Sequence, residues 1–154
     1  MTAFEPGSAD YERRTRDSFA RQAAMRLIGA EMTRVEPGRV EIVLPFSEDI
    51  TQQHGFIHAG MTSALADTAG GFAAYTLFPP EASVLTAEYK INLLSPAVGP
   101  RLVAVGEVLK PGRTLTTCEV AVYNQADDGS RKLCAKVLQT LARVGPRSDI
   151  AQAG

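Results

Sequence analysis

The stretch that decides the fold is Ala59-Gly-Met-Thr-Ser-Ala-Leu-Ala-Asp-Thr-Ala-Gly-Gly-Phe-Ala-Ala-Tyr-Thr-Leu-Phe78, the least polar part of the chain. Its larger side chains recur at helical spacing, which predicts a buried helix that must end before Pro79 and Pro80. The residues on this buried stripe are Met61, Leu65, Thr68, Phe72 and Tyr75.

Asp67 is the charged residue inside this predicted helix. It falls on a second stripe, whose other members are the small residues Ser63, Gly70, Gly71 and Ala74. A carboxylate among apolar and small residues costs free energy unless it is paired, hydrogen-bonded or shifted in pKa. The small neighbours also let another molecule approach the helix closely. We therefore predict a functional role for Asp67, with a structural salt bridge to a strand as the alternative.

Length and composition indicate one globular domain. The chain has 154 residues, of which 45% are hydrophobic and 21% charged. The net charge of −1, without a long basic run, gives no reason to expect a nucleic-acid partner. The first residues carry Glu5 and Asp10 and lack the apolar core of a secretory signal. The run 69–78 falls short of the roughly 20 residues of a membrane span, so we expect a cytoplasmic protein without a membrane partner.

The order of predicted elements indicates an α+β fold. An amphipathic helix over 11–27 gives an N-terminal segment (1–27), the main domain covers 28–146, and 147–154 is a flexible tail. Within the domain, strands over 28–35 and 39–46 precede the long helix, and strands over 84–94, 102–110, 115–124 and 132–144 follow it. An antiparallel sheet should curve around the one central helix, leaving an edge for dimerisation to cover.

Two strand patterns are specific enough to test. Alternation over 84–94 predicts a half-buried strand with one apolar face, formed by Leu85, Ala87, Tyr89, Ile91 and Leu93.

The last hairpin should turn at Asp128-Gly129, which places Val120 opposite Val137 and Val122 opposite Ala135. In this register Cys118 faces residue 139 and Cys134 faces residue 123, so we expect buried thiols rather than a disulfide.

The run Gln52-Gln-His-Gly-Phe-Ile-His-Ala-Gly60 leads into the helix. Free N–H groups and the positive end of the helix dipole can stabilise a developing oxyanion there. Asp67 lies eight residues beyond Ala59, which is about 12 Å along the helix axis. The two cannot act on one carbonyl within a single protomer. Either they are unrelated or the site is shared between subunits, and we favour the shared site.

These residues resemble a known family. His54-Gly-Phe-Ile-His-Ala-Gly60 followed by Leu65-Ala-Asp67 resembles the hotdog-fold thioesterases of the phenylacetic-acid-pathway (PaaI) type. The later stretches Lys90-Ile-Asn-Leu-Leu-Ser-Pro-Ala97 and Lys110-Pro-Gly-Arg113 also fit, and the resemblance covers about residues 28–144. It implies an acyl-CoA thioesterase that assembles as a dimer or a tetramer of two dimers and needs no metal or other cofactor.

The resemblance also implies roles for individual residues. Asp67 matches the catalytic carboxylate, acting as general base or nucleophile, and Gln52 matches a residue that positions the water or the thioester. The Ala59 N–H matches the oxyanion donor, although glycine is common there, and His58 matches the residue that supports the helix start. Thr86 matches a serine or threonine that helps hold the water in some members.

The remaining candidates concern the substrate. Lys90, Lys110 and Arg113 could meet the phosphates of coenzyme A. Pocket walls that select the acyl group are expected at Phe56, Ile57, Phe72 and Tyr75. The full set of predicted substrate-binding residues is His54, Gly60, Gly71, Lys90, Asn92, Lys110 and Arg113.

Three alternatives stay open at this point. His54 and His58 have a spacing that binds zinc on a helix, but Gly55 and the absence of an evident third ligand argue against a metal. An enoyl-CoA hydratase on the same scaffold would need a histidine beside the substrate's α and β carbons. A non-catalytic acyl-CoA-binding module would not need Gln52, His58 and Asp67 together.

Overall fold

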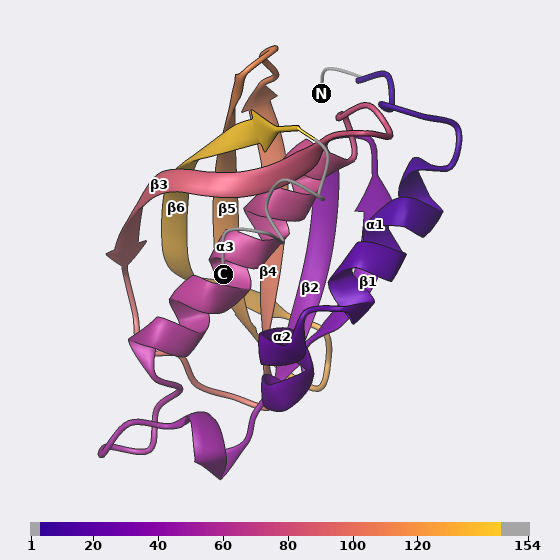
Figure 1. Ribbon diagram of the computed structural model, residues 1–154. Helices are drawn as coiled ribbons and strands as arrows, with labels where there is room; N and C mark the ends of the chain where they lie inside the picture. The colour runs from indigo at the N-terminus through magenta and orange to yellow at the C-terminus, as the bar shows by residue number, and fades with distance from the viewer. Residues whose placement is uncertain (1–3, 146–154) are drawn as a thin grey trace.

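The computed structural model describes residues 4–145, so the predicted tail 147–154 lies outside the described residues. Two short helices, α1 (Tyr11–Ala20) and α2 (Ala23–Ile28), precede the hairpin of β1 (Glu31–Glu36) and β2 (Arg39–Pro45). A 3-10 turn, η1 (Glu48–Ile50), leads to the long helix α3 (Ala59–Tyr75). The chain ends with the four strands β3 (Ser83–Leu93), β4 (Arg101–Lys110), β5 (Leu115–Gln125) and β6 (Arg131–Val144) (Figure 1).

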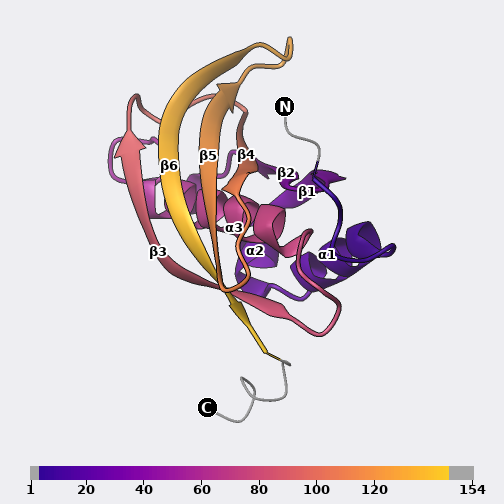
Figure 2. The ribbon, with the colours of Figure 1, turned by 90° about the horizontal axis from the view of Figure 1, so that it is seen from above.

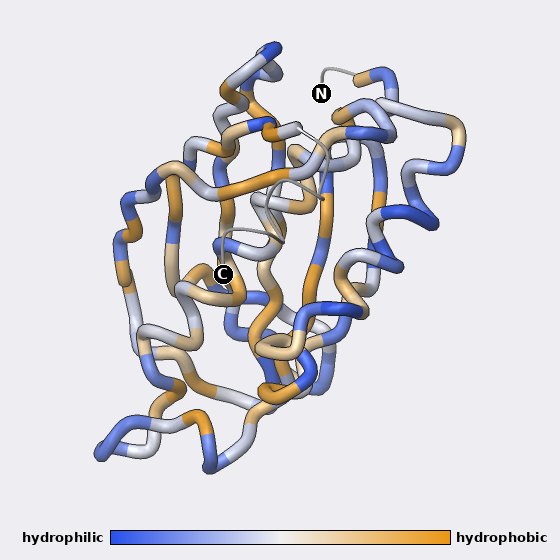
Figure 3. Tube along the Cα trace, in the orientation of Figure 1, coloured by the Kyte–Doolittle hydropathy of each residue, from blue (hydrophilic) through white to orange (hydrophobic). Residues whose placement is uncertain are grey.

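The predicted α+β architecture is confirmed. All strand pairs are antiparallel and form one sheet in the order β1-β2-β4-β5-β6-β3. Figure 2 shows this sheet curving around α3. Figure 3 shows β2 as largely hydrophobic and α1 as largely hydrophilic, which matches their places in the core and at the surface.

Small residues let the sheet approach α3 on several sides. Ala66, Ala69 and Ala73 have no exposed surface. A Cβ on Gly106 of β4 would overlap the backbone carbonyl of Ala69. The adjacent glycines Gly70 and Gly71 of α3 differ: a Cβ on Gly70 would overlap the side-chain oxygen of Gln139, whereas one on Gly71 would only touch Leu141 at 3.9 Å. Gly70 thus permits close packing against the sheet, and Gly71 borders free space.

The last hairpin follows the predicted register up to a bulge. Cys118 pairs with Gln139, Val120 with Val137 and Val122 with Ala135, as expected. Beyond Val122 a bulge shifts the register, so Tyr123 pairs with Leu133 instead of Cys134. The predicted partner of Cys134 was therefore wrong by one residue. Both cysteines are free and buried, as predicted.

The prediction of a half-buried β3 with regular alternation was wrong. A bulge between Thr86 and Glu88 interrupts the alternation. Thr86 pairs with Leu141 and Tyr89 pairs with Gln139, and both partners belong to the inward row of β6. The bulge therefore brings Thr86 to the same face as Tyr89, with Ala87 as the extra residue.

In the protomer this inward face is also more exposed than predicted, because β3 is an edge strand and only one of its sides is paired. On this face Tyr89 and Leu93 are 41% and 54% exposed. Leu85, which pairs with Ala142 and so lies on the opposite face, is 49% exposed.

The single helix predicted over 11–27 is two helices. Gln22 has an extended backbone (ψ 101°) that breaks the run, and α2 continues to Ile28, which had been assigned to the first strand. The break redirects the chain so that Met25 is buried while Phe19 packs edge-on against Phe72 at 6.0 Å. Leu27, in the second helix, is 87% exposed.

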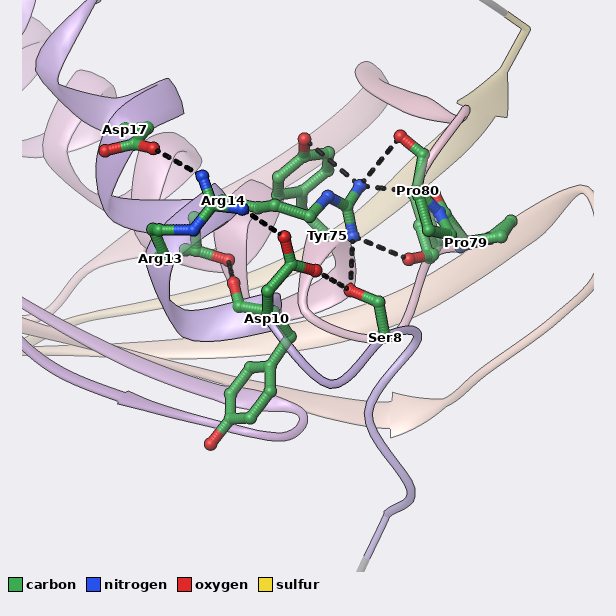
Figure 4. Close-up of polar contacts among 11 residues, drawn as sticks. Ser8, Asp10, Arg13, Arg14, Asp17, Tyr75, Pro79 and Pro80 are labelled. Carbon is green, nitrogen blue, oxygen red and sulfur yellow. Dashed lines mark hydrogen bonds and ion pairs between the residues drawn. The ribbon is translucent and has the colours of Figure 1, made fainter.

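Arg14 joins α1 to the end of α3 (Figure 4). Its guanidinium donates to the carbonyls of Phe78, Pro79 and Pro80 at 3.2 to 3.3 Å and lies 5.0 Å from the centre of the Tyr75 ring. One side chain thereby caps several backbone carbonyls beyond the last turn of α3 and adds a cation–π contact.

Within residues 4–145, no helix combines the length and the apolar character that crossing a membrane would require.

The two cysteines give a pH-dependent prediction. Burial raises the pKa of Cys118 to about 12 and that of Cys134 to about 11, because desolvation disfavours the thiolate. At a pH of about 8 the folded protein should react slowly with Ellman's reagent, and both thiols should react at once in guanidinium chloride. The free energy of unfolding should fall as pH rises above 9.0, because only the unfolded chain then loses these protons. Fast labelling of folded protein would contradict this placement.

Candidate active site

The carboxylate of Asp67 lies where α3, β3 and β6 meet. Thr86 on β3 donates a hydrogen bond from Oγ1 to Asp67 Oδ1 at 2.7 Å. Gln139 on β6 donates from Nε2 to the same Oδ1 and also to the backbone carbonyl of Asp67 at 3.1 Å. Among the described residues, nothing donates a hydrogen bond to Oδ2. One carboxylate oxygen is therefore held by the protein and the other is available to a ligand or water.

The contact with Thr86 brings together two of the predicted site residues. It depends on the bulge in β3, because strict alternation would have put Thr86 on the face opposite to Tyr89 and Ile91. The salt bridge considered as an alternative role for Asp67 is not found in the described part of the chain, where its partners are neutral.

Gln139 is the residue that sequence reasoning missed. It is fully buried and belongs to the inward row of β6, whose other members are the apolar residues Ala135, Val137 and Leu141. A signal was present in the sequence: the predicted hairpin register already placed a glutamine in this apolar row. A buried amide in such a row calls for a polar partner.

The start of α3 has the geometry expected of an anion-binding end. His58 is the N-cap, and its Nδ1 accepts a hydrogen bond from the Gly60 N–H at 2.8 Å. The His58 carbonyl accepts from the N–H groups of Met61 and Thr62 at 2.9 and 3.1 Å. Within residues 4–145, the N–H of Ala59 has no acceptor. His58 thus supports the helix start, Gly60 serves the cap, and Ala59 presents a free donor.

Gln52 and His54 lie in the turn before α3. The Gln52 N–H donates to the Phe56 carbonyl at 2.8 Å, and its side-chain Oε1 accepts from the His54 N–H. This contact fixes the orientation of the amide and leaves Nε2 without an acceptor in the described region. Gln52 can therefore donate to a substrate carbonyl or a water, and His54 contributes its backbone N–H to this turn.

The two halves of the predicted site line different cavities of the protomer. Gln52, Phe56, Ile57 and Ala59 line a cavity of about 400 Å³, together with residues 93–97 at the end of β3. A second cavity of about 340 Å³ contains the carboxylate, and its walls are Gln22, Asp67, Thr68, Gly71, Phe72, Val84, Leu85 and Thr86. One chain alone does not place Ala59 beside Asp67.

Other predicted substrate contacts are spread over the sheet. Lys90 and Asn92 are exposed on β3, opposite Leu138 and Lys136 of β6. Lys110 ends β4 and Arg113 lies in the turn that follows; β5 and β6 lie between β4 and β3 in the sheet.

Of the predicted acyl walls, Phe72 lines the cavity of Asp67, whereas the Tyr75 ring lies beneath the guanidinium of Arg14. No group of three or more His, Cys, Asp or Glu side chains within 4–145 could hold a metal ion.

Comparison with known proteins by sequence gives a consistent answer. The sequence profile of the thioesterase superfamily matches residues 54–130. A Saccharolobus solfataricus protein named by prediction as an esterase is 34% identical over 113 residues, which are 73% of this chain and 72% of that protein. The 1,4-dihydroxy-2-naphthoyl-CoA hydrolase of Listeria monocytogenes is 26% identical over 107 residues, covering 70% of this chain and 85% of the hydrolase.

Comparison by structure agrees. A thioesterase family protein from Silicibacter pomeroyi superposes with a TM-score of 0.85 at 45% identity, over 88% of this chain and 98% of that one. The PaaI protein of E. coli superposes with a TM-score of 0.80 at 18% identity, over 91% of this chain and 97% of PaaI, and so supports the fold. The predicted resemblance to PaaI-type hotdog thioesterases is confirmed, and the chain belongs to the thioesterase superfamily.

Proposed function

We propose that this protein hydrolyses aryl- or medium-chain acyl-CoA thioesters at a site shared by two subunits. The observation that carries the proposal is the division of the site: a carboxylate with a free oxygen lies in one cavity, and a free N–H at a helix start lies in another. The Listeria relative, named as a CoA thioester hydrolase, supports coenzyme A as the carrier.

Pairing of two β3 edges would bring the halves together. β3 is the last strand of the sheet and exposes Leu85, Tyr89 and Leu93. The cavity of Asp67 borders residues 84–86 at one end of β3, and the cavity of Ala59 borders residues 93–97 at the other end. Antiparallel pairing about a two-fold axis near the middle of β3 places the first end of one strand against the second end of its partner. Asp67 of each protomer then faces the helix start of the other.

The chemistry follows from these groups. Oδ2 of Asp67 takes a proton from a water molecule, and the water oxygen attacks the thioester carbonyl carbon. The N–H of Ala59 donates to the oxyanion that forms, and Nε2 of Gln52 can donate to the same oxygen or orient the thioester. The C–S bond then breaks, and the thiolate of coenzyme A recovers the proton from Asp67. The products are the free acid and the thiol, and no serine nucleophile is needed.

The Asp67 cavity is suited to the acyl group. Phe72 and Val84 give it apolar walls, and Gly71 adds no side-chain volume. Gln22, from the break between α1 and α2, closes the same cavity. A volume of about 340 Å³ accommodates an aromatic ring or a medium aliphatic chain. The N-terminal helices therefore contribute to the acyl site.

Replacement of Asp67 tests the chemistry. Asp67→Asn should keep the fold and lower kcat/KM by about 1,000-fold or more, because the base is lost. Thiol release from a panel of aryl- and medium-chain acyl-CoA esters gives the measurement. In a single turnover of the unaltered protein in ¹⁸O-water, a general base puts the label into the product acid, whereas a nucleophilic Asp67 would take the label itself. Hydration of crotonyl-CoA, or tight acyl-CoA binding without thiol release, would contradict hydrolysis.

Mixing two variants that each lower kcat tests the shared site. Asp67→Asn and Gln52→Ala damage different halves, so a mixed dimer contains one intact site and one doubly damaged site. After subunit exchange at equal concentrations, about a quarter of wild-type activity should return, because half of the dimers are mixed. If each site belonged to a single chain, the mixture would show only the average of the two variants.

The turn after β4 is the proposed contact for the coenzyme A phosphates. Lys110 and Arg113 are exposed there and make no ion pair with the described residues. Arg113→Ala should raise KM for acyl-CoA by about 3- to 10-fold and leave kcat unchanged, because a phosphate contact remote from the carbonyl acts on binding. Acyl-pantetheine, which lacks the nucleotide, is the control substrate and should show equal KM values for both proteins. An unchanged KM for acyl-CoA would remove Arg113 from the site.

A further inference from the structure

We propose that Gln139 is a positioning residue: its buried amide fixes the carboxylate of Asp67 so that one oxygen stays free for the reacting water. The proposal rests on the function proposed above and assigns a role to a residue on β6, a strand that contributes none of the residues expected to react. It is argued from burial, hydrogen bonds and packing.

A glutamine at this position is costly for the fold. Gln139 has no exposed surface, and Val137 and Leu141, on either side of it in the same row, are buried and apolar. Its Oε1 is buried and has no hydrogen-bond partner among the described residues. A buried polar atom without a partner destabilises the fold relative to an apolar side chain of similar shape. The requirements of the core alone therefore favour an apolar residue here.

The hydrogen bonds determine which way the amide points. Nε2 lies within hydrogen-bonding distance of three oxygens: the Asp67 carbonyl at 3.1 Å, Asp67 Oδ1, and Thr86 Oγ1 at 3.4 Å. Rotating the amide by half a turn would place Oε1 against a carbonyl and a carboxylate, which have no proton to donate. The orphan Oε1 is therefore the consequence of directing the NH₂ group at Asp67.

This contact restrains the whole side chain of Asp67. One NH₂ group binds both the backbone carbonyl and the carboxylate of the same residue, so it fixes the rotation about the bonds between them. Thr86 donates to the same Oδ1, which then has two donors. Oδ2 keeps its lone pairs for the water, and the base is held in one orientation before substrate binds.

Gly70 provides the space for this arrangement. It lies on α3 one turn beyond Asp67, and a Cβ there would overlap Oε1 of Gln139 and come within 3.0 Å of Val120. The neighbouring Gly71 is not restricted in this way, since its nearest contact would be 3.9 Å away. Gly70 and Gln139 are thus coupled in packing, because the absence of a side chain at Gly70 leaves room for the amide of Gln139.

The first test replaces the amide without creating a cavity. Gln139→Met keeps the length of the side chain and removes both the donor and the orphan oxygen. We expect an unchanged or higher Tm, an unchanged KM and a kcat lower by about 10- to 100-fold, because the base is no longer held in one orientation. The matched control is Val137→Ala in the same buried row, which should lower Tm and keep kcat. Unchanged kcat in Gln139→Met would overturn the proposal.

A double-mutant cycle separates positioning from damage to the core. In the Asp67→Asn background, Gln139→Met should cause no further loss of kcat, because its effect passes through the carboxylate. Losses that multiply would show a structural effect and overturn the proposal.

Gly70 supplies a second, independent cycle. Gly70→Ala should lower kcat on its own, and it should add no further loss in a Gln139→Ala protein, where the new methyl group has space. An undiminished loss there would separate Gly70 from Gln139. If the wild-type protein releases no thiol from any acyl-CoA, the proposed function fails; if it does and Asp67→Asn lowers kcat to a residual rate that is still measurable, the cycles test Gln139 alone.

Discussion

Close contact between α3 and the curved sheet is the constraint on which the rest of this structure depends. A sheet can enclose a helix only where the side chains between them are small, and the alanines and Gly70 of α3 meet this condition. The same closeness brings a carboxylate on the helix within hydrogen-bonding distance of Thr86 and Gln139 on two different strands. Close packing and the contacts of Asp67 therefore both require small residues in this stretch of sequence.

Much of this could be predicted from the residues alone. The long apolar run could only be a buried helix, because its period is helical and two prolines follow it. The turn at Asp128-Gly129 fixed the pairing of Val120 with Val137, since a hairpin register follows from its turn. The support that His58 gives to the helix start was expected through family resemblance, and the structure shows that it is the N-cap and that its Nδ1 accepts the bond.

What could not be predicted has a common physical origin. The bulge in β3 and the break at Gln22 are places where tertiary packing overrides a regular local pattern. Without the bulge Thr86 would lie on the wrong face, so its contact with Asp67 was expected only through family resemblance. Gln139 was within reach of the sequence argument, because the register placed it in an apolar row, but its partner lies 72 residues away on another element.

The exposed edge of β3 affects both the aggregation and the activity of a protomer that has not assembled. Unpaired backbone groups beside Leu85, Tyr89 and Leu93 offer a template on which any extended segment can assemble, so an isolated protomer is prone to aggregation. If each active site needs residues from two subunits, that protomer also cannot hydrolyse thioesters. Newly made chains would become protected from aggregation and active at the same step, dimer formation. At high dilution the rate of hydrolysis would therefore vary with the square of protein concentration.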